Sequence, residues 1–345
     1  MVGGLGGVDA ALAARFGAEA LAGAGEDGAA LLSALRAATV GGKRFRPWLV
    51  EAVHHAYGGQ RPEAVAPVGA GVELLHTAFV VHDDVIDGDA TRRGQPSVPE
   101  RFRTAAVERG ASAERARTYG LAGAVLTGDL ALSAAVRSVA TAPAPPGVTA
   151  RLLDLVDDAL AVTASGELAD VRLATHPGTP ALSDVLTMEE QKTAVYSFAL
   201  PMQLGAVLAD AEDSVVRAVG EVGRLLGAAF QLQDDLLGVF GDPAVTGKSR
   251  TCDLREGKAT ALVTHARGTS SWPSVERHWG DPDLTEAGAA EVRRLLRESG
   301  SLAYVETLVV EHVDAASAAG RTCGFPGELL TELSGLCVLP VRGAA

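Results

Sequence analysis

Two clusters of aspartate residues lie within apolar stretches of this 345-residue sequence. The first contains Asp83, Asp84 and Asp87, and the second contains Asp234 and Asp235, with Asp242 seven residues after Asp235. On a helix, Asp83 and Asp87 lie on one face one turn apart, where like charges repel. Magnesium relieves such repulsion, because it binds one or two carboxylates and completes its octahedron with water and phosphate oxygens. The clusters therefore predict magnesium sites, which could hold one diphosphate if they face each other across a helical bundle.

A third aspartate pair, Asp157-Asp158, serves as an internal control. No further carboxylate follows this pair one turn later, and no basic loop comes after it. Asp157-Asp158 is therefore predicted to be an ordinary exposed pair on a solvated face.

Basic residues follow both of the other clusters. Arg92-Arg93 lies nine residues beyond Asp83, and Lys248 lies fourteen residues beyond Asp234. Acidic residues for a metal beside basic residues for phosphate predict a metal–diphosphate site. Lysine is scarce among the 30 basic residues, and the four lysines are Lys43, Lys192, Lys248 and Lys258. Their scarcity alone does not separate phosphate ligands from solvated surface lysines.

Charge and composition exclude several classes of protein. The net charge of −13 argues against nucleic acid as a partner, although local cations still permit a phosphorylated small molecule. The start of the chain lacks a basic segment followed by a sustained apolar run, so no signal peptide is predicted. No membrane span is predicted, because no unbroken apolar run reaches about 20 residues. The three scattered cysteines are typical of a cytoplasmic protein.

The helix period recurs throughout an alanine- and leucine-rich chain. Glycine- and proline-rich breaks separate the helical segments, most clearly at residues 58–62, 88–99, 142–147, 176–180 and 268–282. No sheet is predicted, because β-branched runs with hairpin signals are absent. We therefore expect one all-α, single-domain helical bundle over residues 1–345, with residues 1–10 and 341–345 loose.

Several motifs occur together and in order along the chain. They are Gly-Gly-Lys-Arg-Phe-Arg-Pro at 41–47, the stretch 73–96, Gly-Glu-Leu-Ala-Asp at 166–170, Gln-Lys-Thr-Ala at 191–194, and the stretches 230–242 and 253–260. In this combination the chain resembles the trans-isoprenyl diphosphate synthases, also called polyprenyl synthetases. The resemblance implies a helical bundle of the isoprenoid synthase type, with a central cavity for the prenyl chain. It also implies a homodimer.

The resemblance assigns roles to residues at the motif positions. Isopentenyl diphosphate would be bound through its diphosphate by Lys43, Arg46, His76 and Arg93. The allylic diphosphate would be bound by Arg92, Lys192, Lys248 and Lys258. Magnesium would be bound directly by Asp83, Asp87 and Asp234, with Asp84 and Asp235 near it. The developing carbocation would be faced by Thr193 and Gln231, which together with Lys192 form the catalytic set.

The implied reaction joins two diphosphate substrates. Cations neutralise charge as the allylic carbon–oxygen bond breaks, and the double bond of isopentenyl diphosphate then attacks the allylic cation. The released diphosphate is the expected proton acceptor. Three magnesium ions are expected when substrate is bound, with manganese able to substitute.

Three positions depart from the pattern that is common in the family. Gly238 stands where many relatives have the third aspartate of the second cluster. Pro99 replaces a frequent histidine, and Glu167 replaces a frequent glutamine. Asp242 could partly substitute for the aspartate that is missing at Gly238, and neither Pro99 nor Glu167 removes a metal ligand.

Product length is expected to depend on the helix that carries Asp83. Phe79 lies one turn before Asp83, where a bulky ring would limit the growing chain, and Ala78 beside it leaves room. Geranylgeranyl diphosphate (C20) is the expected product and farnesyl diphosphate (C15) the next. The alternative for Phe79 is simple core packing. The alternatives for the protein are a class I terpene cyclase and a non-catalytic partner subunit of a prenyl synthase.

Overall fold

A computed structural model describes residues 5–15, 25–175, 178, 180–241 and 251–338. The chain divides into two compact units. Unit 1 comprises Met1–Val156 and Leu204–Ala211, and unit 2 comprises Asp157–Gln203 and Glu212–Ala345. The single domain over residues 1–345 and the central prenyl cavity remain predictions.

Unit 1 is built around helix α4 (Pro62–Asp87), which packs along α6 (Ala113–Ala140). Close approach of the two helices depends on small residues. A side chain at Gly71 would come within 2.8 Å of Val139 and 3.1 Å of the Ala135 carbonyl oxygen. The α4 segment between Val68 and Leu75 is buried throughout, which explains why it is apolar except for Glu73.

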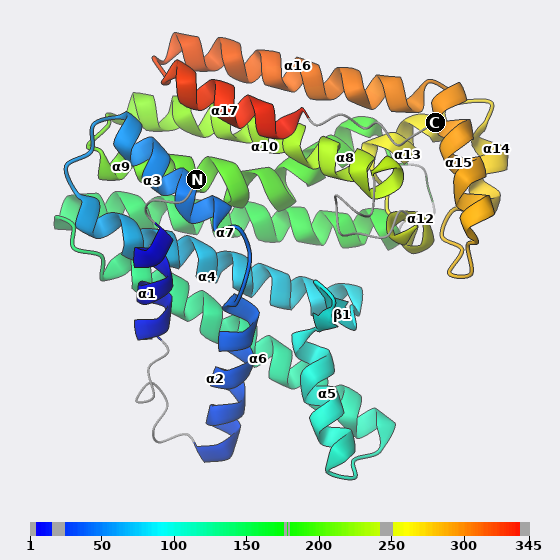
Figure 1. Ribbon diagram of the computed structural model, residues 1–345, viewed down its shortest axis with the longest axis horizontal. Coiled ribbons are helices and arrows are strands. Elements are labelled where there is room, and N and C mark those ends of the chain that lie inside the picture. The colour runs from blue at the N-terminus through cyan, green and yellow to red at the C-terminus, as the bar shows by residue number, and fades with distance from the viewer. Residues whose placement is uncertain (1–4, 16–24, 176–177, 179, 242–250, 339–345) are drawn as a thin grey trace. The chain divides into compact units, whose positions relative to one another are not determined.

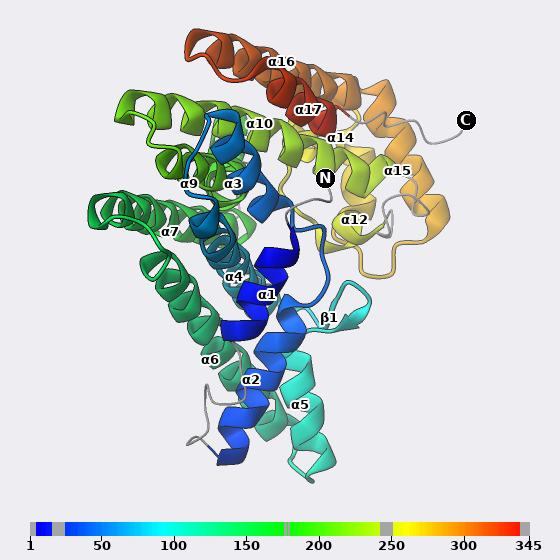
Figure 2. The same cartoon turned by 60° about the vertical axis from the view of Figure 1, so that its left-hand side comes forward.

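Four further helices of unit 1 contact this pair, and the unit also includes the first turns of α7 (Pro146–Thr175) and the last turns of α9 (Leu200–Leu208). The four helices are α1 (Leu5–Arg15), α2 (Gly25–Thr39), α3 (Phe45–Ala56) and α5 (Val98–Glu108). Figure 2 shows α2 and α5 beside α6. Helix α5 begins at Ser97, whose hydroxyl accepts the Glu100 backbone N–H, and its Phe102 ring packs against Gly123 of α6.

Two expectations for unit 1 are wrong in detail. Residues 5–10 are helical where a loose segment is predicted, because Val8 and Leu12 of α1 are buried one turn apart. A small sheet also exists: β1 (Thr91–Arg92) pairs antiparallel with β2 (Gln95–Pro96). Its turn residues Arg93 and Gly94 have φ angles of 52° and 72°, a left-handed pair typical of tight hairpins. Arginine in the first turn position gives no hairpin signal in the sequence.

Unit 2 is built around α10 (Asp213–Phe240), which packs on α16 (Ser301–Thr322) and on the π-helix η1 (Glu190–Ala199). Gly223 and Gly227 of α10 meet the η1 backbone at Ala199 and Ala194. The remaining elements are the end of α7, α8 (Leu182–Glu189), the start of α9 (Leu200–Leu208), α12 (Cys252–Glu256), α13 (Ala261–Arg267), α14 (Trp272–Val275), η2 (Glu276–His278), α15 (Glu286–Glu298) and α17 (Gly327–Cys337). The predicted break at 268–282 thus contains two short helices.

The all-α fold class is confirmed. Two described helices, α4 and α6, are long and apolar enough to cross a membrane by length and composition alone. In α4, 67% of the apolar window is buried, as in a core helix, and in α6 39% is buried. Among the described residues, these two helices are only weak evidence for a membrane span.

Candidate active site

The first aspartate cluster occupies the last turns of α4. Asp83 and Asp87 lie one turn apart on this helix, as the spacing predicts, with Asp83 half-buried and Asp87 exposed. Asp84 is only 2% exposed. The helix ends at Gly88, whose φ of 72° is a left-handed conformation that glycine adopts readily.

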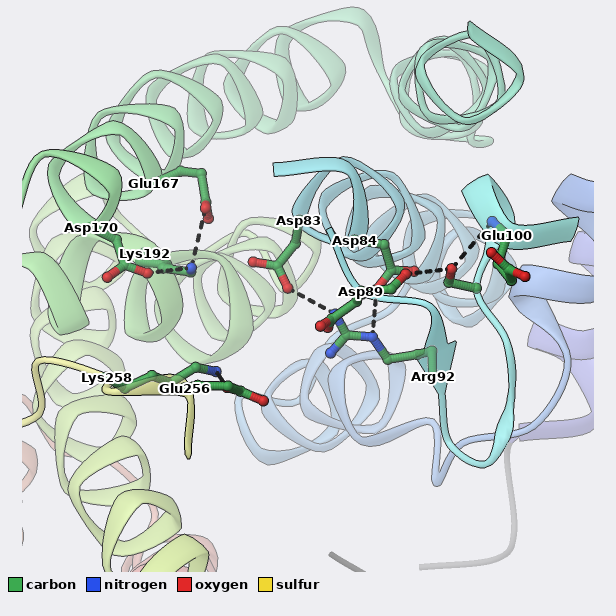
Figure 3. A network of polar contacts seen from close by, with 11 residues as sticks. Asp83, Asp84, Asp89, Arg92, Glu100, Glu167, Asp170, Lys192, Glu256 and Lys258 are labelled. Atoms are coloured by element: carbon green, nitrogen blue, oxygen red, sulfur yellow. Dashed lines mark hydrogen bonds and ion pairs between the residues drawn. The ribbon is translucent and has the colours of Figure 1, made fainter. Parts of the chain in front are cut away.

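Arg92 bonds two carboxylates of this cluster, Asp83 and Asp84, and also that of Asp89 (Figure 3). Its Nε donates to Asp84 Oδ1 at 2.7 Å, and its Nη2 donates to Asp83 Oδ2 and Asp89 Oδ2, both at 3.0 Å. The hairpin explains the geometry, because β1 brings Arg92 back to the helix that has just ended. Burial raises the pKa of Asp84 to about 6, although the Arg92 guanidinium opposes the shift.

A cavity of about 380 Å³ lies beside this network within unit 1. Its lining includes Gly41, Glu73, His76, Asp84, Arg92 and Arg93. Burial lowers the pKa of His76 well below its ordinary value, and Arg46, Arg93 and Arg92 lower it further. His76 is therefore a neutral imidazole, which can donate one N–H to a ligand.

Two of the four predicted isopentenyl diphosphate residues, His76 and Arg93, line this cavity. A side chain on Gly42 would meet Arg93 Nη1 at 3.4 Å, so the Arg93 guanidinium lies against the glycine loop that precedes α3. Lys43 in that loop is exposed, and Arg46 in the first turn of α3 is half-buried. The structure thus brings His76, Arg92 and Arg93 to one cavity and places the loop beside them.

The second aspartate cluster lies on α10 in unit 2. Asp234 and Asp235 are both half-buried, and Gln231 Nε2 donates to Asp235 Oδ1 at 2.8 Å. Gln231 thus contacts an aspartate of its own helix, and its predicted role toward a carbocation stays a prediction. Asp242 and Lys248 lie outside the described residues.

Lys192 of η1 forms the centre of a second polar network (Figure 3). Its Nζ donates to Glu167 Oε1 at 3.1 Å and to Asp170 Oδ2 at 2.6 Å, both on α7. The η1 backbone passes so close to α7 that a Cβ atom on Gly166 would lie 2.3 Å from the backbone nitrogen of Lys192. π-helices are rare overall but occur frequently at functional sites. No pattern in the residues of this segment predicts one.

The other predicted residues lie on η1, on α4 and just before α13. Thr193, next to Lys192 on η1, is half-buried. Lys258 is exposed and pairs with Glu256 at 3.2 Å. On α4, Ala78 is buried and Phe79 is half-buried. These positions accord with the predicted roles without testing them.

Glu189 was missed by the sequence analysis. This residue, at the end of α8, is 6% exposed, and its Oε1 accepts the Ala261 backbone N–H at 3.4 Å. Burial raises the pKa of Glu189 well above its ordinary value, and the neighbouring Asp235 carboxylate raises it further. A charged residue within the sequence Met-Glu-Glu-Gln gave no hint of burial, because its surroundings come from α10 and α13.

The control pair behaves as predicted. Asp157 and Asp158 on α7 are both exposed. The contrast with Asp84 shows that the clusters differ from an ordinary acidic face in burial as well as in neighbouring basic residues.

The donor atoms of the clusters fit magnesium. Over the described residues, no group of three or more histidine, cysteine or acidic side chains is arranged to hold a metal ion. Such a cage is not needed, because magnesium binds one or two carboxylates and keeps water or phosphate at its other positions. Asp83 and Asp87 offer carboxylate oxygens from one helix face, which is the hard donor type that magnesium prefers.

Comparison with known proteins agrees with these features. The family described as Polyprenyl synthetase matches residues 29–278. A geranylgeranyl diphosphate synthase of Methanosarcina mazei is 32% identical over 79% of this chain and 78% of its own length. A (2E,6E)-farnesyl diphosphate synthase of Mycobacterium bovis is 32% identical over 86% of this chain and 78% of its own length.

A solved structure shows the same fold. It is a geranylgeranyl pyrophosphate synthase from Corynebacterium glutamicum, complexed with isoprenyl diphosphate and magnesium. It aligns with a TM-score of 0.86 at 28% identity and covers 96% of both chains. The aspartate clusters, the family match and the shared fold together show that this chain belongs to the polyprenyl synthetase family.

Proposed function

We propose that this protein is a short-chain prenyltransferase that condenses isopentenyl diphosphate with an allylic diphosphate, head to tail, into an all-trans prenyl diphosphate. One observation carries the proposal most directly. Unit 1 places a carboxylate cluster, its bridging Arg92 and a cavity lined by His76 and Arg93 side by side. Carboxylates suited to a metal and cations suited to a diphosphate are what this reaction requires.

Each group of residues has a distinct task. Lys43, Arg46, His76 and Arg93 bind and orient the diphosphate of isopentenyl diphosphate. Arg92, Lys192, Lys248 and Lys258 bind the allylic diphosphate, and Thr193 and Gln231 face its reacting carbon. The neutral His76 contributes a hydrogen bond without adding a fourth positive charge beside Arg46, Arg92 and Arg93.

Divalent metal use is supported by the donor set and by the magnesium of the Corynebacterium glutamicum enzyme. Asp83, Asp87 and Asp234 would hold magnesium, with Asp84 and Asp235 supporting them. The bound ions would neutralise the leaving diphosphate. Their number, expected to be three, and replacement by manganese stay predictions.

The proposed product is geranylgeranyl diphosphate, with farnesyl diphosphate next. The relatives bear both names at the same identity, so overall similarity does not decide the length. The proposal rests on Phe79, which lies half-buried one turn before Asp83 on α4, where its ring can end the space for the chain.

We further propose a homodimer, and the exposed apolar side chains of α6 support it. Leu121, Val125 and Leu126 of this helix are exposed, although its opposite side is buried against α4 and α5. A second copy of the chain would cover this surface.

Light scattering should give twice the chain mass for the native protein and the chain mass for Val125→Glu. Val310→Glu, at an exposed position on α16, is the matched control and should remain a dimer. The cytoplasmic location stays a prediction.

A direct assay tests the activity. Purified protein is incubated with magnesium, isopentenyl diphosphate and, in turn, dimethylallyl, geranyl and farnesyl diphosphate, and the products are sized. Elongation up to C20 is expected. Failure to elongate any primer would contradict the proposal, and a cyclic hydrocarbon would identify a terpene cyclase instead.

A further inference from the structure

The loop between α2 and α3 contains a backbone conformation that is unusual for its residue type. Arg44, the residue before α3, has a φ of 51°. Only Arg44, Arg93 and Asp210 have positive φ among the non-glycine residues of the described chain. A left-handed conformation is unfavourable for a residue with a Cβ and persists only where surrounding contacts hold it.

The Arg44 side chain supplies such contacts. Nη1 bonds Glu73 Oε1 at 2.8 Å, and Nη2 donates to the Thr39 carbonyl oxygen at 2.9 Å. Nε donates to Asp9 Oδ1 at 3.0 Å. The Arg44 and Glu73 side chains are 12% and 9% exposed, so this pair is largely shielded from water. One planar guanidinium thus joins the end of α2 to α1 and α4.

Arg44 reaches Glu73, which lines the 380 Å³ cavity, from outside that cavity. Arg44 lines a separate hollow of about 580 Å³, together with Asp9 and Arg36. Thr39, Val40 and Gly41 line both spaces, so this stretch of the loop forms the wall between them. Arg44 therefore holds the wall of the cavity from behind.

The bond between Arg44 and Glu73 also changes the charge in the wall of the 380 Å³ cavity. Glu73 lines this cavity and lies three residues before His76 on the same face of α4. A carboxylate in that position would repel a diphosphate. Its bond to Arg44 neutralises the charge and directs the oxygen toward the loop.

We propose that Arg44 is a positioning residue for isopentenyl diphosphate: it fixes the glycine loop and Lys43 beside Arg93, and it neutralises Glu73 in the cavity wall. The inference rests on the proposed function. It differs from the roles of Lys43, Arg46, His76 and Arg93, because Arg44 acts through Glu73 and Thr39 and does not touch the substrate.

Arg44→Lys is the first test. The lysine keeps the charge but cannot bond Glu73, Thr39 and Asp9 together, so the loop should lose its fixed position. The KM for isopentenyl diphosphate should rise about tenfold, the effect of one lost bond to a charged group. The KM for the allylic diphosphate should stay within about twofold. Two residues predicted to bind it, Arg92 and Lys192, are held by carboxylates outside this loop.

Two further variants separate positioning from backbone strain. Arg44→Gly removes the side chain but suits the left-handed backbone, so a raised KM for isopentenyl diphosphate would arise from the lost contacts alone. Glu73→Gln keeps an oxygen that accepts the Arg44 bond and removes the charge that would repel a diphosphate, so the same KM should not rise. In Arg44→Lys/Glu73→Gln the KM should rise less than in Arg44→Lys, because only the loss of the loop position remains.

Arg61→Lys is the matched control. Arg61 also precedes a helix of unit 1, and its Nη1 contacts Asp210 Oδ2 at 2.7 Å and the Leu208 carbonyl oxygen at 3.0 Å. The Arg61→Lys variant should leave both KM values unchanged, while lowering the melting temperature about as much as Arg44→Lys does. The proposal is overturned if Arg44→Lys leaves the KM for isopentenyl diphosphate unchanged, or raises both KM values equally. A wild-type protein that elongates no primer would instead contradict the proposed function.

Discussion

Arg92 in unit 1 and Lys192 in unit 2 each bond more than one carboxylate, and the two networks differ in how they do so. In unit 1, Arg92 bonds three aspartates, one of them the buried Asp84. In unit 2, Lys192 bonds Glu167 and Asp170, both only partly buried. The Arg92 site is built from a helix end and a hairpin, whereas the Lys192 site is built from a π-helix against α7.

The difference indicates how far each cation can be replaced. A buried carboxylate must keep its hydrogen-bond partners, and the arginine fork reaches several acceptors in fixed directions. The Glu167 and Asp170 carboxylates that bond Lys192 are partly exposed, so water can replace a lost hydrogen bond. We therefore expect the first network to depend on geometry and the second mainly on charge.

Removing a carboxylate from the first network should have the largest effect. Asp83→Asn keeps the side-chain shape but removes the negative charge that both Arg92 and a metal ion require, so kcat should fall by at least about a hundredfold. Initial rates with isopentenyl and geranyl diphosphate measure this. Asp157→Asn, in the exposed control pair, should have no effect. Equal activity of the two variants would show that Asp83 is not needed for catalysis. That result would favour a non-catalytic partner subunit.

Exchanging the two cations tests the comparison itself. Arg92→Lys should lower kcat/KM for the allylic diphosphate about tenfold, because lysine cannot bond three carboxylates in the same directions. Lys192→Arg keeps the charge beside Glu167 and Asp170 and should cost less than about threefold. Steady-state kinetics with varied allylic diphosphate gives both values. Equal losses in the two variants would show that burial of Asp84 does not separate the networks.

The clusters and their helices could be predicted from sequence because their signals are local. The spacing of Asp83 and Asp87 on α4, and the exposure of Asp157 and Asp158, follow from helical periodicity and neighbouring residues. The order of motifs also indicated the family correctly.

The partners within the networks could not be predicted, because they depend on contacts between distant segments. Lys192 meets Glu167 and Asp170 only because η1 packs on α7. The hairpin that returns Arg92 to the cluster has an arginine at a turn position that usually holds glycine or asparagine. Glu189 is buried by α10 and α13, and no feature of its own segment shows this.

The pH dependence of stability should reveal the buried carboxylate of the first network. The folded pKa of Asp84 is raised to about 6 by burial, so the folded protein binds a proton more tightly there than the unfolded chain. The wild type should therefore lose up to about 3 kcal/mol of unfolding free energy relative to Asp84→Asn as the pH rises from about 4 to 6. Urea unfolding with a chelator present measures the difference. The lost Arg92 bond adds only a constant offset, because arginine stays protonated. A difference that is flat with pH would show that Asp84 ionises normally.

The smallest expected effect concerns a residue type that occurs at the same position before each cluster. A phenylalanine stands four residues before the first aspartate of each, Phe79 before Asp83 and Phe230 before Asp234. Phe230 packs on the Phe198 ring at a centroid distance of 5.3 Å within unit 2. If Phe79 ends the space for the prenyl chain, Phe79→Ala should lengthen the main product by one isoprene unit, while Phe230→Ala leaves the length unchanged. Chromatography of the dephosphorylated products distinguishes these outcomes. Longer products from both variants would mean that either ring limits the chain. Unchanged products from Phe79→Ala would make its ring a packing residue, as Phe230 is against Phe198.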